Sequence, residues 1–297
     1  MKAKDINVDS SKQEITQNIP GFSISCYFSE FSWDTYNYID WHWHVEFQLC
    51  VVTEGSIIWQ IGPQQIIANR GEGIFINSQQ VHMAKPYFCD NAAFFCVDFR
   101  PDAICPDKAS TLYATSVLPI LNNSRLHAKK LLPGEGEAHT VLEQLDRMSS
   151  LFSAKENGYE FDLVSALYLV WKNLQPQLAC DAGVGSAFSD TRLKDILIFL
   201  QQNYSRCLSL DEIAASINLS RSECCRYFKK QTGQTIFEYL MQYRIHKSLD
   251  LLRNTDMEIA RIAVESGFSN QSYYTSRFRG LIGMTPKQYR ATTQGVH

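Results

Sequence analysis

Residues 210–233 read LDEIAASINLSRSECCRYFKKQTG, and residues 258–283 read EIARIAVESGFSNQSYYTSRFRGLIG. Both stretches contain an Ile-Ala pair, then a polar turn, then a Phe followed by a basic residue. Ala214 and Ala263 are 49 residues apart, whereas Phe228 and Phe278 are 50 apart, so the second copy has one extra residue in its turn. An internal repeat predicts a duplicated structural unit, and two copies are too few for a solenoid.

Helix start and stop signals divide each copy into a short helix, a tight turn and a longer helix. A Ser or Thr followed three residues later by Glu or Gln predicts a capping box, which satisfies free backbone amides. Four such pairs occur, namely Ser209 and Glu212, Ser220 and Glu223, Thr255 and Glu258, and Thr285 and Gln288. Gly233, Gly267 and Gly283 follow the apolar runs, where a left-handed residue commonly ends a helix. The spacing predicts two helix-turn-helix motifs, at 210–231 and 258–281.

The charge is unevenly distributed along the chain. From Thr191 to His297 there are 15 Lys and Arg against 9 Asp and Glu, a net charge of +6, whereas the preceding part carries −9. The formal total of −3 conceals this difference. A basic module joined to an acidic one is expected of a nucleic-acid-binding protein. A helical packing domain that binds no nucleic acid is the alternative.

The motifs of the last third of the chain resemble those of a known family. They include Ile213-Ala214, Phe228-Lys229-Lys230, Gly267-Phe268 and the closing string GMTPKQYR at 283–290. Together they resemble the C-terminal domain of AraC/XylS transcription regulators. The resemblance implies a cytoplasmic regulator whose partners are promoter DNA, a small-molecule effector, RNA polymerase and a second copy of the chain. It implies no enzymatic activity, no cofactor and no membrane partner.

The predicted fold class is a two-domain α+β protein, with an N-terminal cupin-like β-barrel plus a helical pair and a C-terminal all-α domain. Residues 1–20 are polar and lack the apolar core of a secretory signal, and no apolar run is long enough to cross a bilayer. Nine cysteines, an odd number without Cys-x-x-Cys spacing, favour reduced thiols. The expected domains are a disordered N-terminus at 1–20, a ligand-sensing and dimerisation domain at 21–174, a linker at 175–189 and a DNA-binding domain at 190–297.

Short alternating apolar runs separated by Gly and Pro turns extend from Gly21 to Phe99, which is typical of a β-sandwich or small barrel. The last clear strand is expected at 93–99, and 102–133 is expected to be irregular. Helical periodicity then predicts helices at 137–152 and 161–174. In the family such a pair often mediates dimerisation, and simple packing against the barrel is the alternative.

His42, His44 and His82 resemble the three histidine ligands of a cupin metal site. Gln48 stands at the position of the cupin glutamate and is a poor metal ligand, although Glu46 could replace it. Three imidazoles could hold zinc or iron. The alternative is that the positions remain while the metal has been lost, and we predict a ligand site without a metal.

Aromatic and polar residues of the same region suit a small-molecule pocket. Trp41, Trp43 and Trp59 offer flat apolar faces, and an apolar cavity with a few polar groups is the usual ligand site. Sugars and other small metabolites fit this chemistry, and the aromatics could equally belong to the core. The predicted ligand-binding residues are His42, His44, Gln48, Trp59 and His82. The alternative function is a metal-dependent cupin enzyme with a helical appendage.

The second helix of each motif, at 220–231 and about 270–281, is the predicted recognition helix. Arg226 is expected to read a base because its planar fork pairs with guanine O6 and N7, and Gln271 can pair with adenine. Expected phosphate contacts are Arg221, Lys229, Lys230 and Arg279. The full predicted DNA-binding set adds Ser222, Cys225, Ser272, Thr275 and Ser276. A helix over 236–253 joins the motifs and fixes their distance, which must be ~34 Å to reach successive major grooves.

Overall fold

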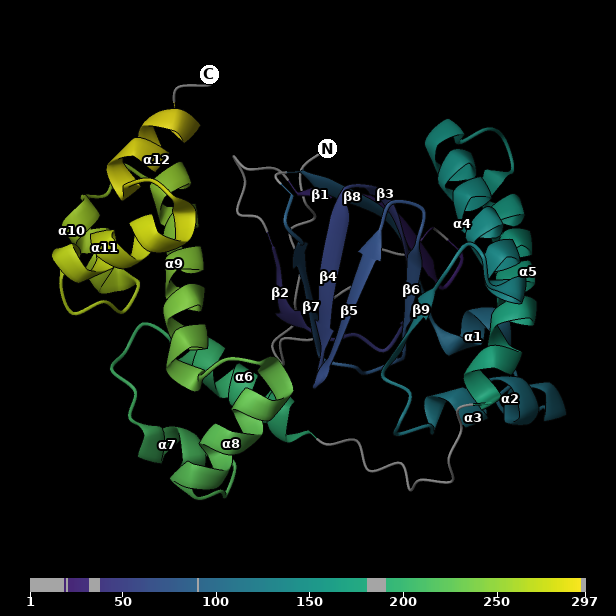
Figure 1. The fold of residues 1–297 in the computed structure, drawn as a ribbon, viewed down its shortest axis with the longest axis horizontal. Coiled ribbons are helices and arrows are strands. Elements are labelled where there is room, and N and C mark those ends of the chain that lie inside the picture. The colour runs from purple at the N-terminus through teal and green to yellow at the C-terminus, as the bar shows by residue number, and fades with distance from the viewer. Residues whose placement is uncertain (1–18, 20, 32–37, 90, 181–190, 295–297) are drawn as a thin grey trace. The chain divides into compact units, whose positions relative to one another are not determined.

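The computed structural model describes residues 19, 21–31, 38–89, 91–180 and 191–294 (Figure 1). The chain separates into two compact units, Met1–Asp190 and Thr191–His297. The first unit is built on β-sheets and the second is entirely helical in its described part, which confirms the predicted fold class. None of the helices in the described ranges is long and apolar enough to cross a membrane.

The N-terminal unit contains two antiparallel sheets. The five-stranded sheet has the order β1 (Ile24–Phe31), β8 (Ala92–Phe99), β3 (Phe47–Glu54), β6 (Gly73–Ile76) and β9 (Ala128–Leu131). The four-stranded sheet has the order β2 (Ile39–His42), β7 (His82–Pro86), β4 (Ser56–Ile61) and β5 (Gln64–Asn69). Strands distant in sequence, such as β3 and β8, therefore lie side by side.

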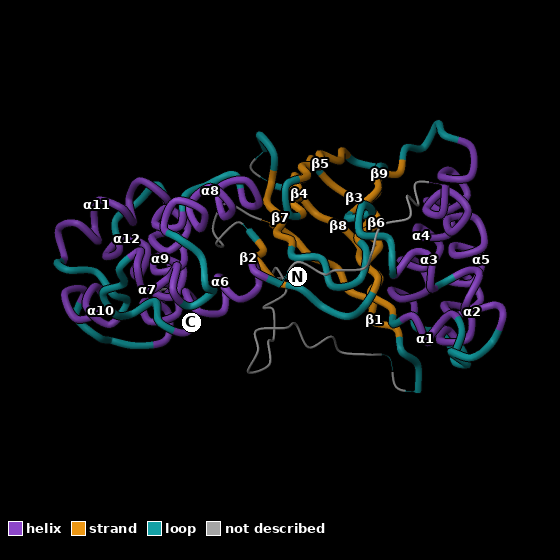
Figure 2. The backbone as a smooth tube through the Cα atoms, turned by 90° about the horizontal axis from the view of Figure 1, so that it is seen from below, coloured by secondary structure: helices purple, strands orange, loops and turns teal. Residues whose placement is uncertain are grey.

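Strand β3 shows why the unit has three layers. Successive side chains of a strand point to opposite faces. Phe47 and Leu49 pack in a core formed with α4 (Gly136–Ala154) and α5 (Tyr159–Cys180), whereas Cys50 packs in a second core with side chains of the four-stranded sheet. The helices thus cover one face of the five-stranded sheet and the other sheet covers the opposite face (Figure 2).

The region expected to be irregular contains three short helices, α1 (Pro101–Ile104), α2 (Thr111–Ser116) and α3 (Leu118–Leu121), and it ends with β9. These elements, like β2, have only four to six residues, which is too short to show a periodic pattern. Helix α4 matches its prediction closely.

Helix α5 is longer than predicted. It continues through Pro176 to Cys180, so residues 175–180, expected in the linker, are helical. Leu174 and Leu178 are fully buried on one face, and this packing outweighs the low helix propensity of proline. The remaining linker residues, and residues 1–20 apart from buried Ile19, lie outside the described ranges.

The C-terminal unit contains seven helices in its described part. They are α6 (Arg192–Gln202), α7 (Leu210–Ala215), α8 (Arg221–Thr232), α9 (Ile236–Asn254), α10 (Ile259–Glu265), α11 (Gln271–Ile282) and α12 (Pro286–Gln294). Helix α9 runs between the group of α6 to α8 and the group of α10 to α12 (Figure 1). Each helix-turn-helix motif therefore packs on a different end of one shared helix.

Helix caps confirm three of the four predicted boxes. The Ser209 and Ser220 boxes start α7 and α8, and Thr285 exchanges hydrogen bonds with Gln288 before α12. The Thr255 box was wrong, because Thr255 ends α9, where its hydroxyl donates to the Leu251 carbonyl over 2.6 Å. An unpredicted box, Thr235 with Glu238, starts α9 instead.

Buried hydrogen bonds attach α9 to both groups of helices. Gln201 of α6 donates to the Tyr239 hydroxyl over 2.8 Å, and Tyr274 of α11 donates to the Ser248 hydroxyl over 3.0 Å. Between them, Arg244 donates to the carbonyl oxygens of Tyr204 and Arg206, at 2.7 and 2.8 Å.

Gly267 brings the second motif against the loop that Arg244 holds. Its φ is +85°, and a Cβ there would lie 2.5 Å from the Tyr204 carbonyl oxygen and 2.8 Å from Arg244 Nε. Only a glycine allows this close approach. The second motif thus contacts the loop after α6 as well as α9.

We expect Gly267→Ala to destabilise the C-terminal unit more than Gly283→Ala. Both positions have φ near +83°, so each alanine adds backbone strain on the order of 1 kcal/mol. Only at position 267 would the new Cβ clash with backbone atoms, and this overpacking should add about 1–3 kcal/mol to the loss of stability. Denaturant unfolding of the full chain, followed by far-UV circular dichroism, measures the difference. The five tryptophans all precede residue 172, so their fluorescence reports the N-terminal unit as an internal control. Equal losses would contradict the close approach.

Candidate functional site

The first predicted recognition helix, α8, has one buried face and one exposed basic face. Cys224 and Phe228 are buried, and Tyr227 is half-buried under the Arg192 guanidinium, 4.5 Å from its ring centroid. All six side chains predicted to contact DNA from α8 are exposed, namely Arg221, Ser222, Cys225, Arg226, Lys229 and Lys230. The face that carries them is therefore open to a large ligand.

Two arginines of α8 differ in what they contact. The Arg221 guanidinium binds both carboxylate oxygens of Asp211, which ties α8 to α7. Arg226 makes no ion pair with any residue that the structure describes. The nearby Glu223 accepts hydrogen bonds from the hydroxyl and backbone amide of Ser220, and these bonds, with a smaller effect of Arg226, lower the pKa of Glu223. Arg226 is thus the arginine of α8 available to an added acceptor.

The second predicted recognition helix, α11, has a similar division. Tyr274 and Phe278 are buried, and the Asn270 side chain caps the helix by accepting from the Tyr273 amide over 2.8 Å. Gln271, Ser272, Ser276 and Arg279 are exposed, and Thr275 is half-buried. The prediction left out Arg277, an exposed residue whose guanidinium lies 5.1 Å from the Tyr273 ring centroid. Its position one residue before Phe278 could have indicated it.

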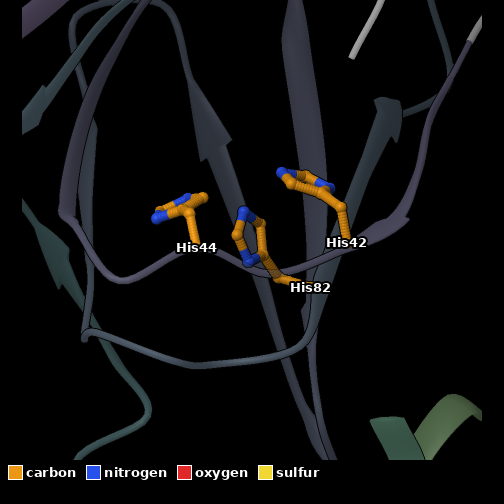
Figure 3. Close-up of side chains that lie close together, drawn as sticks. All are labelled: His42, His44 and His82. Carbon is orange, nitrogen blue, oxygen red and sulfur yellow. The ribbon is translucent and has the colours of Figure 1, made fainter. Parts of the chain in front are cut away.

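The structure brings the three predicted histidines together. His42 ends β2 and pairs in register with His82 at the start of β7, and His44 follows in the next loop. The ring centroid of His82 lies 4.1 Å from that of His42 and 5.1 Å from that of His44. Figure 3 shows the His82 ring between the other two. We call these three residues the histidine cluster.

All three histidines of the cluster are buried, and each hydrogen-bonds through Nδ1 to a backbone carbonyl two residues away. The carbonyls belong to Asp40, Glu46 and Gln80, at 2.8, 3.1 and 2.9 Å from His42, His44 and His82 respectively. A carbonyl oxygen only accepts, so Nδ1 carries the proton and Nε2 keeps its lone pair. Burial lowers the pKa of His82 well below its usual value, and the two neighbouring imidazoles lower it further. His82 is therefore neutral at neutral pH.

Gln48 lies in a separate polar group on the five-stranded sheet. Its amide donates to the Asp98 carboxylate over 3.0 Å and to the Tyr27 hydroxyl over 3.3 Å. Cys96 donates to the same carboxylate oxygen over 3.3 Å, and the Cys50 sulfur lies 3.4 Å from that of Cys96. The prediction missed Asp98, although its place in the alternating strand 93–99 marked it as a sheet residue with a polar side chain.

The predicted tryptophan faces are buried. Trp59 belongs to the apolar core between the two sheets, where its ring packs edge-on against Phe94 at 5.8 Å. Trp41 and Trp43 are each 4% exposed. The structure therefore places Trp59 in the core, which is the alternative that the sequence left open for these aromatics.

Comparisons with known proteins identify both units. Residues 22–170 match the family model of the AraC-like ligand binding domain, and residues 213–292 match that of a helix-turn-helix domain. The first match alone covers half of the chain.

Whole-chain relatives are transcription regulators. The chain is 31% identical to the uncharacterized HTH-type transcriptional regulator YdeC of Bacillus subtilis, over 97% of this chain and 98% of that protein. It is 25% identical to the HTH-type transcriptional activator RhaS of Klebsiella pneumoniae, over 84% of this chain and 86% of that protein. Among solved structures, ToxT of Vibrio cholerae is 14% identical with a TM-score of 0.46, over 92% of this chain and 100% of that one.

We expect Gln48→Leu to cost about 1–3 kcal/mol of stability, because it removes a donor from the buried carboxylate of Asp98. The same substitution in an Asp98→Asn background should cost less, since no buried charge then loses its donor. Denaturant unfolding followed by tryptophan fluorescence gives both values. Identical costs in the two backgrounds would show that Gln48 does not stabilise the carboxylate.

Proposed function

The chain belongs to the AraC family of transcriptional regulators, and we propose that its C-terminal unit binds promoter DNA through α8 and α11 under the control of a small molecule held in its N-terminal unit. Within this proposal the DNA-binding domain is 190–297 and the sensing and dimerisation domain is 21–174. The observation that carries it is the exposed basic face of α8, whose Arg226 has no ion pair in the described part of the chain.

Two features support reading of two grooves by one chain. First, α8 and α11 each start at a side-chain cap and each bury the face that packs on α9, so their opposite faces are exposed. Second, α9 is one continuous helix, which holds the two motifs at a fixed distance. A fixed distance suits a B-DNA duplex, in which successive major grooves on one face are ~34 Å apart.

The exposed side chains of α8 suggest two different roles. The Arg226 guanidinium is exposed and carries several N–H donors in one plane, which suits the edge of a guanine base. Lys229 and Lys230 lie in the last turn and suit phosphates, which position a protein without specifying sequence. Arg221 can serve a phosphate only by exchanging Asp211 for it, and because both side chains are exposed that exchange costs little. From α11, Gln271 and Thr275 are the proposed base contacts.

The N-terminal unit is the proposed sensor. The histidine cluster supplies polar groups inside the sheet domain, and Gln48 belongs to a second polar group there. We propose a small polar metabolite, with sugars among the candidates, as the effector. Regulators named RhaS and RhaR are activators, and we propose the same role for this chain. We also propose RNA polymerase as its partner and the cytoplasm as its location.

A homodimer formed through α4 and α5 completes the proposal. Most apolar residues of the pair are buried within it, but α5 leaves Phe161, Tyr168 and Leu169 exposed. Apolar side chains grouped on a helix surface suit a second copy of the chain. The metal-dependent enzyme is not favoured, because the relatives are transcription regulators.

We expect Arg226→Ala and Lys230→Ala to weaken DNA binding in different ways. Loss of a base contact should cost ~1–3 kcal/mol on the cognate duplex and much less on a scrambled one. Loss of a phosphate contact should weaken both duplexes equally and reduce the salt slope by about one contact. A cognate duplex selected from a random pool by the full chain, titrated at several salt concentrations, tests both.

Equal losses on both duplexes for Arg226→Ala would make it a phosphate contact and leave base reading to α11. If the unaltered chain binds no duplex in a salt-dependent manner, the proposed DNA interface is wrong as a whole.

A further inference from the structure

The histidine cluster brings three ionisable side chains together in a buried place. One ring nitrogen of each of His42, His44 and His82 lies within 4.8 Å of those of the other two. In the described part of the chain, no other group of three His, Cys, Asp or Glu side chains is arranged to hold a metal ion. Three imidazoles whose ring nitrogens converge in this way can share one ligand.

The hydrogen bonds of the cluster prepare the ring nitrogens for such a ligand. A histidine that binds a metal almost always donates its other N–H to a carbonyl or carboxylate, which fixes the tautomer and the ring orientation. Here all three Nδ1–H groups donate to backbone carbonyls two residues away. This orienting bond occurs in all three histidines, which lie on two strands and a loop. It leaves Nε2 of each ring as the ligand atom.

Two of these Nε2 atoms have no hydrogen-bond partner. His44 Nε2 and His82 Nε2 are both buried and unsatisfied. A buried polar atom left without a partner costs about 1–3 kcal/mol. A shared ion would satisfy both atoms at once and remove this cost.

We propose that His42, His44 and His82 form a binding site for one divalent transition-metal ion of the zinc class. Three imidazole nitrogens suit zinc, cobalt, nickel, copper or iron, whereas magnesium and calcium require oxygen ligands. In a tetrahedral site with Zn–N near 2.1 Å the nitrogens are about 3.4 Å apart. Ring nitrogens that lie within 4.8 Å of one another must therefore approach by roughly 1.4 Å at most.

A site with three protein ligands leaves one coordination position for water or for a donor atom of another molecule. The cluster lies in the unit that we propose as the sensor, so the ion would be the effector or would hold it. That role rests on the proposed function, whereas binding of the ion does not. Glu46 adds a negative charge beside the cluster, because its buried carboxylate lies 3.9 Å from His44 Nδ1.

The experiment uses the untagged full chain, stripped with a chelator and titrated with Co²⁺ and then Zn²⁺. We expect about one ion bound per chain, visible as the absorption of four-coordinate Co²⁺ and displaced by Zn²⁺. His44→Gln and His82→Gln should each weaken binding at least about 100-fold, because loss of a ligand exceeds the loss caused by removing its hydrogen-bond partner. His139→Ala is the matched control, since His139 is an exposed residue of α4 and should leave binding unchanged.

A second measurement keeps the proposal testable if a variant fails to fold. Zn²⁺ should raise the unfolding temperature of the tryptophan-containing unit of the unaltered chain by mass action. No bound ion and no shift in the unaltered chain, or binding by His44→Gln and His82→Gln as tight as that of the unaltered chain, would overturn the site. DNA affinity of the same stripped sample is measured in parallel, so a failure of the metal site is distinguished from a failure of DNA binding.

Discussion

Helix α9 is buried at both ends by different groups of helices, and the arrangement of the C-terminal unit depends on this. The Gln201 to Tyr239 bond fixes its start to the first motif, and the Tyr274 to Ser248 bond fixes its end to the second. Arg244 and Gly267 bring the loop after α6 against the second motif. Two short motifs that would be marginal alone are thereby held together on one helix, and the proposed reading of two grooves requires such a fixed spacing.

The N-terminal unit is organised differently. Side chains of β3 alternate between its two faces, so that one face packs on the helices and the other on the second sheet. The interior therefore has few places for polar groups. The histidine cluster and the set around Asp98 occupy two of them. Buried polar groups are costly unless they are satisfied. One carboxylate oxygen of Asp98 accepts from Gln48 and Cys96, and the Nε2 atoms of His44 and His82 have no hydrogen-bond partner.

The sequence predicted the features that depend on local signals. Caps at Ser209 and Ser220 and the left-handed Gly233 and Gly283 located the two motifs within a residue or two. The histidines were predicted by resemblance and are found together. Features that depend on tertiary packing were missed. Strands β2, β7 and β9 pair with strands that are distant in the sequence. Arg221 binds Asp211 on the other side of a turn, and α5 continues through Pro176 because Leu178 is buried.

We propose that one chain reads two successive major grooves because α9 holds α8 and α11 at a fixed distance. Hydroxyl-radical and methylation footprinting of the full chain on its selected duplex tests this most directly. We expect two protected patches for each bound chain, centred about 10 base pairs apart on one face of the duplex. A single protected patch per chain, or two patches on opposite faces, would contradict it.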